Sequence, residues 1–251
     1  MKLLFLGTGT STGIPQIGCS CEVCQSVNPK DKRLRTSLLV TINNKNILID
    51  CGPDFRQQML SNNIKNLDAV LLTHHHYDHI SGLDELRSFT NNKAMPVYAE
   101  EYVEETIKRI FPYCFGENKY PGVATFDIRK IDNKKFNVSD VNVVPIRVMH
   151  YNLPIFGYRI GNVAYITDML TISEEEIKKL ESLDILIINA LRHKEHISHQ
   201  TLKNALNIIR RVTPKKAYLI HMSHQMGLHD EVSKQLPENV CFAYDGLQIE
   251  L

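Results

Sequence analysis

One short run in the first third of the chain combines the side chains that bind catalytic metal ions. It reads His74-His75-His76-Tyr77-Asp78-His79, so the candidate ligands follow the spacing His-x-His-x-Asp-His. Imidazole suits zinc, iron and manganese, and a carboxylate adds negative charge, which together fit a catalytic divalent metal. The apolar stretch Ala69 to Leu72 predicts a buried strand that delivers this run to a sheet edge. The alternative is a solvated histidine-rich turn, which this internal position behind a strand disfavours.

Further ligands are expected elsewhere, because four residues in one tight loop cannot surround two ions. Three candidates stand where a predicted strand stops: His150 after Val141 to Val148, Asp168 after Val163 to Thr167, and His221 after Ala217 to Ile220. A lone polar residue at a strand end is more often a cap. Together with the histidine run, the three become credible ligands.

Three cysteines fall within six positions, at Cys19, Cys21 and Cys24. Closely spaced thiolates suit a closed structural zinc site, which needs one further ligand. His224, three residues beyond His221, is the natural fourth ligand and would complete a Cys3His site. The alternative is three buried cysteines without a metal. The remaining cysteines, Cys51, Cys114 and Cys241, are interpreted as small core residues.

The elements that position these residues follow from apolar periodicity and turn residues. Further strands are predicted at Lys2 to Leu6, Ser37 to Ile42, Asn46 to Asp50, Phe156 to Ile160, Ile185 to Asn189 and Val240 to Tyr244. Helices are predicted at Asp54 to Leu60, at Ser173 to Leu183 with Ser173 as its N-cap, and at His199 to Arg211. Leu86 to Gly122 is interpreted as an irregular insertion over the active site. This order predicts an α/β fold of two sheets packed face to face, with helices outside.

Length and composition limit the class of protein. The 251 residues are expected to form one domain spanning 1–251, and 43% hydrophobic with 23% charged residues is ordinary for a globular protein. Proteins that bind long nucleic acids usually carry an excess of positive charge, whereas the formal net charge here is +1. A small substrate therefore fits better. The N-terminal apolar run is too short for a signal peptide, and no run approaches the roughly 18 residues of a membrane span. We therefore expect a cytoplasmic protein without membrane partners and leave a homodimer open.

Taken together, Thr73-His74-x-His76-x-Asp78-His79, His150, Asp168 and His221 resemble the metal-binding set of metallo-β-lactamase-fold hydrolases. The resemblance implies a four-layer αββα sandwich with a dinuclear site. It implies that His74, His76 and His150 hold one metal. It also implies that Asp78, His79 and His221 hold the other and that Asp168 bridges the two. Asp78 would then be both a ligand and a catalytic residue.

Other motifs narrow the resemblance to the phosphoribosyl cyclic phosphodiesterase branch. They are Gly7-Thr8-Gly9-Thr10, Gly13-x-Pro15, Gly18-Cys19-x-Cys21-x-x-Cys24, His221-Met222-Ser223-His224 and Tyr244-Asp245-Gly246. In that branch the cysteines and the second histidine hold a structural zinc beside the catalytic pair. Asp50 resembles an aspartate that orients a metal ligand by hydrogen bonding, although a plain turn-forming role is equally open.

The resemblance also implies a catalytic histidine from the loop ahead of a helix. The tract from Arg192 to His199 holds three candidates, of which we favour His199, with His196 second. Surface positions for all three histidines are the alternative. His199 would protonate the leaving oxygen.

The expected function is metal-dependent hydrolysis of a small phosphodiester, such as a cyclic ribose phosphate. Two catalytic zinc or manganese ions would generate the hydroxide, beside one structural zinc. One alternative is an RNA 3'-processing endonuclease of the same fold, which needs a long RNA-binding arm that the sequence does not reveal. Another is a non-catalytic zinc-binding scaffold, which would gain nothing from open metal positions.

Overall fold

The computed structural model describes residues 1–90, 93–116, 119 and 121–251. The chain divides into two compact units. The first consists of Met1–Leu6, Ser37–Asp132 and Gln248–Leu251, and the second of Gly7–Thr36 and Asn133–Leu247. The single domain expected from length stays a prediction.

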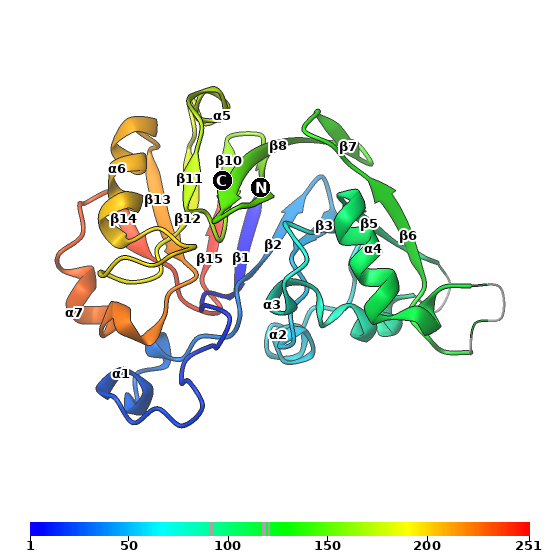
Figure 1. The fold of residues 1–251 in the computed structure, drawn as a ribbon, viewed down its shortest axis with the longest axis horizontal. Coiled ribbons are helices and arrows are strands. Elements are labelled where there is room, and N and C mark those ends of the chain that lie inside the picture. Colours follow the sequence, from blue (N-terminus) through cyan, green and yellow to red (C-terminus); the bar gives the residue numbers. More distant parts are fainter. Residues whose placement is uncertain (91–92, 117–118, 120) are drawn as a thin grey trace. The chain divides into compact units, whose positions relative to one another are not determined.

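A seven-stranded sheet forms the frame of the first unit (Figure 1), in the order β15-β1-β2-β3-β4-β5-β6. The strand bounds are β1 Lys2–Gly7, β2 Ser37–Ile42, β3 Lys45–Ile49, β4 Ala69–Leu71, β5 Met95–Ala99, β6 Phe126–Lys130 and β15 Gln248–Glu250. Strands β3 to β6 run parallel, so their carboxyl ends share one edge of the sheet. β1 pairs antiparallel with β15, and the Met1 amino group donates to the Leu251 carbonyl at 2.7 Å.

Short helices cover this sheet with apolar side chains. Their bounds are α2 Phe55–Ser61, α3 Tyr77–Ile80, α4 Glu101–Ile110, and the 3-10 helices η2 Leu83–Phe89 and η3 Pro112–Cys114. Val103 and Ile107 stand one turn apart on α4 and are buried in the same core as Val70 of β4 and Val97 of β5. Cys51 and Cys114 are buried in this core, which confirms their interpretation as core residues.

An eight-stranded sheet forms the second unit, in the order β11-β8-β9-β10-β12-β13-β14, with β7 paired to β8. The bounds are β7 Phe136–Val138, β8 Val141–His150, β9 Leu153–Ile160, β10 Val163–Ile166, β11 Thr171–Ile172, β12 Ile185–Asn189, β13 Lys216–Ile220 and β14 Val240–Phe242. Strands β10, β12, β13 and β14 are parallel, and all five residues of β12 are buried. Near-continuous apolar runs are typical of strands in a covered parallel sheet.

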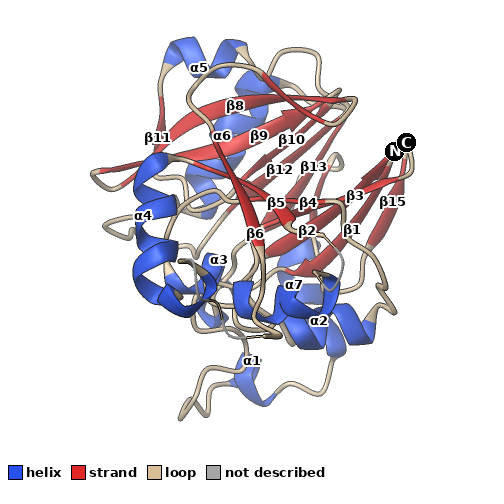
Figure 2. Ribbon diagram, turned by 90° about the vertical axis from the view of Figure 1, so that its right-hand side faces the viewer, coloured by secondary structure: helices blue, strands red, loops and turns tan. Residues whose placement is uncertain are grey.

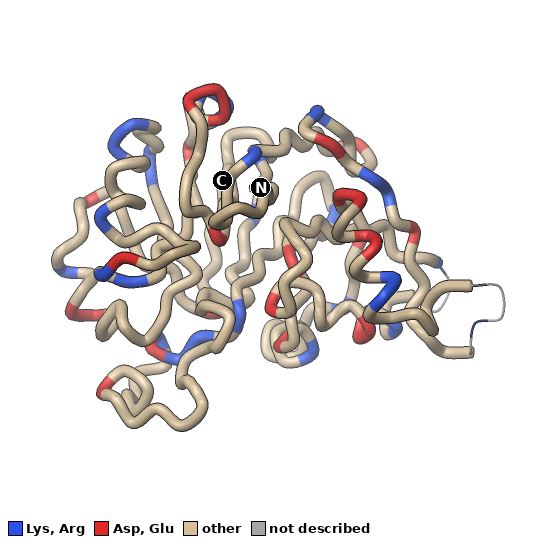
Figure 3. Tube along the Cα trace, in the orientation of Figure 1, with Lys and Arg blue, Asp and Glu red and all other residues tan. Residues whose placement is uncertain are grey.

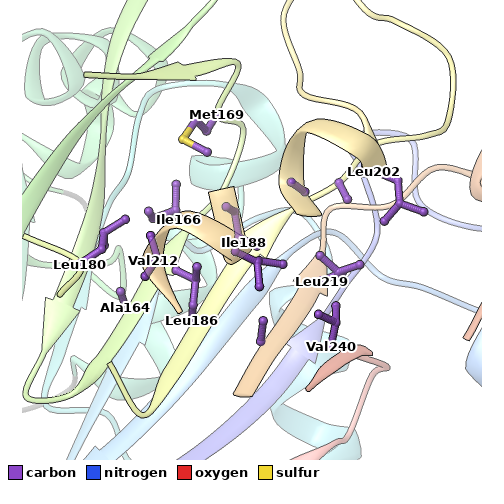
Figure 4. Packing of buried hydrophobic residues seen from close by; sticks show 14 of the residues in the cluster. Ala164, Ile166, Met169, Leu180, Leu186, Ile188, Leu202, Val212, Leu219 and Val240 are labelled. Atoms are coloured by element: carbon purple, nitrogen blue, oxygen red, sulfur yellow. The ribbon is translucent and has the colours of Figure 1, made fainter. Parts of the chain in front are cut away.

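Helices and short turns complete the second unit (Figure 2). They are α1 Glu22–Gln25, α5 Glu174–Lys178, α6 Leu202–Val212, α7 His229–Ser233, and the 3-10 helices η1 Pro29–Asp31 and η4 His224–Met226. Figure 4 shows the core beneath α6, where Leu202 and Val212 belong to the same buried cluster as Ile188 of β12 and Leu219 of β13. Each unit thus combines helices with a mixed sheet, which confirms the α/β class.

Most predicted strands and the helix predicted at Asp54 to Leu60 are confirmed to within about two residues, whereas the bounds of the other two predicted helices needed correction. The helix predicted from His199 begins only at Leu202, because the Thr201 hydroxyl caps it by accepting from the Asn204 N–H at 3.2 Å. His199 therefore lies in a loop. The Ser173 N-cap is confirmed, but its helix ends at Lys178, and Ser182 has left-handed backbone at φ +57° that stops further helix.

The interpretation of Leu86 to Gly122 as irregular is wrong, because β5 and α4 lie within it. β5 is a fully buried run of only five residues that contains Pro96, and its brevity hid it in the sequence. Residues 91, 92, 117, 118 and 120 of this stretch lie outside the described residues. Across the described chain, the helices all fall short of the length and apolar character that crossing a bilayer demands.

Candidate metal centres

The histidine run follows β4 in the first unit and turns into α3. His76 is the N-cap of α3, so Asp78 and His79 lie in its first turn rather than in an extended loop. His74, Asp78 and His79 are buried and His76 is half-buried. The side chain of His79 approaches Asp78, with Nε2 and Oδ2 3.1 Å apart, and its ring centroid lies 4.2 Å from that of His74. The His76 ring lies 4.6 Å from the His74 ring, so all four candidate ligands converge.

The two intervening residues of the run point elsewhere. His75 packs edge-on against Tyr102 of α4, with ring centroids 5.3 Å apart. Burial lowers the pKa of His75. Tyr77 is exposed to 68%. Neither belongs to the converging group.

Asp50, directly after β3, holds the run in place. Its carboxylate accepts from the Thr73 backbone N–H at 2.9 Å, from the Thr73 hydroxyl, and from Nδ1 of His79 at 2.7 Å. Burial raises the pKa of Asp50, while the hydrogen bonds to His79 and Thr73 oppose that shift. With Nδ1 of His79 engaged, Nε2 is the ring atom left to bind a metal. The structure thus favours the orienting role for Asp50 over a plain turn.

In the second unit, His150, Asp168 and His221 occupy strand ends. His150 is the last residue of β8, Asp168 follows β10 by two positions, and His221 directly follows β13. Nε2 of His221 lies 3.1 Å from Oδ1 of Asp168, and the Thr167 hydroxyl donates to the other Asp168 oxygen at 2.6 Å. Nδ1 of His150 donates to the Ser198 carbonyl at 2.9 Å, which leaves Nε2 as its ligand atom.

His199 joins the strand-end group from the loop ahead of α6. Its ring stacks on His221 with centroids 4.9 Å apart, lies 4.6 Å from His150, and its Nδ1 is 3.7 Å from Oδ1 of Asp168. Burial lowers the pKa of His199 to about 3, the neighbouring imidazoles add to this effect, and the Asp168 carboxylate opposes it. The ring is therefore neutral near pH 7 in the metal-free chain.

The other two histidines of the tract are less closely placed. His196 lies 5.2 Å from the His199 ring, and its Nδ1 pairs with the Ser198 hydroxyl at 3.2 Å. Burial lowers the pKa of His196 as well. His193 pairs through Nε2 with the Met226 carbonyl. The geometry favours His199 as the residue nearest the chemistry, with His196 behind it.

The cysteine loop and His224 meet within the second unit. One ligand atom from each of Cys19, Cys21, Cys24 and His224 lies within 4.8 Å of the others, and Nδ1 of His224 is 3.4 Å and 3.2 Å from the Cys19 and Cys21 sulfurs. The His224 contact lowers the pKa of Cys21 to about 6, whereas burial raises that of Cys24 to about 11. Three sulfurs and one imidazole in this cluster match the donor set of a closed tetrahedral zinc site.

Comparison with known proteins identifies the family. A model of the beta-lactamase superfamily domain matches residues 45–222, which is well over half of the chain. The chain belongs to the beta-lactamase superfamily. The predicted metallo-β-lactamase type of fold is thereby confirmed.

Three relatives are similar to this chain over different shares of its length. The crystal structure of a diphosphatase from the PhnP family superimposes with a TM-score of 0.93 at 39% identity, over 100% of this chain and 97% of that one. An octanoyltransferase from Porphyromonas gingivalis is 47% identical over 251 residues, which cover 99% of this chain and 51% of the relative. A ribonuclease Z from Clostridium acetobutylicum is 29% identical over 142 residues, 51% of this chain and 44% of the relative. The chain thus spans only about half of the length of each of these two sequence relatives.

The sequence indicated the candidate ligands and the orienting role of Asp50, but it did not reveal two further orienting groups. Thr73 contacts both Asp50 and Nδ1 of His74, at 2.9 Å, and the Ser198 carbonyl fixes His150. A threonine between a strand and the first histidine of the run could have signalled such a role. A backbone carbonyl carries no sequence signal.

The cysteine cluster yields the first prediction. Cys21→Ser should remove one tightly bound zinc and lower the melting temperature, because a structural zinc contributes to folding and a hydroxyl is a poor substitute for thiolate. Elemental analysis after mild chelation and a thermal melt measure the two effects. Cys241→Ser, at a half-buried cysteine outside the cluster, is the matched control and should keep the zinc. Full zinc content and an unchanged melt in Cys21→Ser would refute the assignment.

Proposed function

We propose that this chain is a dinuclear metal-dependent phosphodiesterase that hydrolyses a small phosphodiester, with a cyclic ribose phosphate as the leading candidate. The observation that carries the proposal is the gathering of carboxylate and imidazole ligands at strand ends in each unit, with His74, His79 and His150 each engaged through Nδ1. Imidazoles held in this way are prepared to bind a metal through Nε2. The full-length similarity to a PhnP-family diphosphatase supports phosphate ester chemistry.

The ligands divide as the family resemblance implies. We assign His74, His76 and His150 to one metal, Asp78, His79 and His221 to the other, and Asp168 to both. Held by these residues, two divalent ions, zinc or manganese, would supply a hydroxide near neutral pH and would neutralise charge on the phosphate. The donor set of imidazole and carboxylate fits either metal.

The chain's own residues supply orientation and a hydrogen-bond donor. Asp50 holds Nδ1 of His79, and Thr167 holds one oxygen of Asp168, so both ligands keep one geometry before any metal binds. His199, neutral and stacked on His221, donates its ring N–H to the phosphate or to the leaving oxygen. His196 is the second candidate for this role.

Two other substrate classes follow from the relatives. Ribonuclease Z similarity makes a precursor tRNA an alternative, although basic and acidic residues are both spread along each unit (Figure 3) and the formal net charge is +1. The octanoyltransferase similarity covers half of that relative, so octanoyl transfer can belong to its other half. Fold alone does not decide among these substrates.

A substrate panel tests the proposal. Purified protein loaded with manganese or zinc is assayed on cyclic ribose phosphates, linear diesters, a precursor tRNA, an octanoyl thioester and a lactam. We expect the highest kcat/KM on a small phosphodiester. A preference for precursor tRNA by tenfold or more would establish the ribonuclease alternative, and activity on the thioester or lactam alone would overturn the proposal.

The role of His199 generates a separate prediction. His199→Ala should keep its metal content yet slow phosphodiester hydrolysis by about 10²-fold or more, the usual scale for losing one hydrogen-bond donor aimed at charge that develops in the transition state. The loss should be smaller on a nitrophenyl ester than on an ester with a sugar alcohol as leaving group, because nitrophenolate needs less stabilisation from a donated hydrogen bond. Metal analysis and the rate ratio on the two esters are the measurements.

His196→Ala is the matched control for this experiment. We expect a small effect on both esters. The His199 ring stacks on His221 and approaches Asp168, whereas His196 packs against His199. Equal losses on both esters in His199→Ala would point to substrate positioning. A defect confined to His196→Ala would show that His196 holds the catalytic role.

A further inference from the structure

A cavity of about 730 Å³ lies in the second unit, away from its strand-end ligands. It is lined by the start of β13, by α7, by all of β14 and by the tail that follows β14. Lys216, the first residue of β13, lines it, whereas His221 follows the opposite end of that strand. At about 3.3 Å per residue, five residues place the two roughly 16 Å apart. The cavity is therefore distinct from the candidate catalytic groups.

Positive charge gathers in this cavity, although the whole chain is nearly neutral. Lys30, Lys216 and Lys234 all line it, and within the described residues none of the three forms an ion pair with a carboxylate. Lys216 donates only to the Glu238 carbonyl, at 3.3 Å. The one carboxylate among the lining residues, Asp230, accepts from the Asn28 side-chain amide at 2.9 Å. The lining is thus suited to an anion carrying more than one negative charge.

His229 adds a hydrogen-bond donor to the lining, because the protein fixes the tautomer of its imidazole ring. The buried Arg33 guanidinium donates to Nδ1 of His229 at 3.0 Å, and is itself held by the Thr8 hydroxyl and the Ala243 carbonyl. Because Nδ1 accepts, the proton of the neutral ring must sit on Nε2. Burial, helped by Arg33 and Lys30, lowers the pKa of His229 to about 4, so the ring is neutral at pH 7.

Aromatic rings form the rest of the lining. Tyr218, Phe242 and Tyr244 all face the cavity, and the Lys30 ammonium lies 5.0 Å from the centroid of the Tyr244 ring. Rings beside cations accept a planar base by stacking while the lysines bind its phosphate. A volume of about 730 Å³ falls within the range of small-molecule sites and far exceeds what an inorganic phosphate needs.

We propose that this cavity is a binding site for a nucleoside phosphate, with the base against Tyr218 and Tyr244 and the phosphate among Lys30, Lys216 and Lys234. Neither the metal ligands nor the proposed phosphodiesterase activity enters this assignment. The site goes beyond that function because it lies at the opposite end of β13 from His221.

Cys241, half-buried and part of the cavity lining, reports occupancy locally. The rate of its alkylation by iodoacetamide, followed by peptide mass spectrometry on the metal-loaded protein, is measured with AMP, adenosine and inorganic phosphate. AMP at ten times its Kd should slow alkylation about tenfold by mass action. Adenosine and phosphate should each protect far less at the same concentration. The proposal would be overturned if adenosine slowed the alkylation of Cys241 as much as AMP does. It would also be overturned if AMP at millimolar concentration did not slow the alkylation.

Calorimetric titration with AMP provides the second measurement. Lys234→Ala, at an exposed residue, should raise the Kd for AMP about five- to tenfold, the scale of one typical net hydrogen bond. Lys215→Ala is the matched control, because Lys215 pairs with Asp184 at 2.7 Å and does not line the cavity. A Kd unchanged in Lys234→Ala, or raised equally in Lys215→Ala, would place AMP elsewhere and overturn the proposal.

Discussion

Left-handed backbone at the ends of three strands positions polar side chains of the candidate metal centres. Asp50, Asp168 and His221 follow β3, β10 and β13 with φ of +63°, +57° and +55°. A side chain in this conformation costs roughly 1–2 kcal/mol relative to ordinary backbone. Such residues persist where the surroundings over-determine them, and strained positions cluster at functional sites. Here parallel ladders fix the strands, and the turn at each strand's end directs the polar side chain.

Hydrogen bonding through Nδ1 is the second recurring device. Thr73 contacts Nδ1 of His74, Asp50 accepts from His79, and the Ser198 carbonyl accepts from His150. In each case the protein selects the ring nitrogen that remains for a metal. Ligand orientation is thus built into the metal-free chain, and the entropy of ordering these rings is lost on folding rather than on binding.

Residue type and apolar periodicity were sufficient to predict candidate ligands at strand ends, because His74, His150, Asp168 and His221 each stand just past an apolar run. The Cys3His cluster was predictable for a similar reason, since three thiols in a short loop have few other uses. The sequence did not reveal β5 or α4, whose short apolar pattern is interrupted by Pro96 and by the charged residues of α4. Nor did it reveal the left-handed turns, which Asp and His adopt only when tertiary contacts require them. His199 was predicted inside a helix although Thr201, a preferred N-cap residue type, is the true cap, so the sequence carried the signal for a later start.

The central proposal is that Asp168 is shared by two metal ions, distinct from a zinc that the cysteine cluster would hold. Elemental analysis of the native protein and of Asp168→Asn tests it most directly, since a neutral amide cannot offset the charge of two dications. We predict three ions per chain in the native protein. The variant should retain a single chelator-resistant zinc and lose both labile ions. An Asp168→Asn protein that kept three ions and full activity would contradict the account.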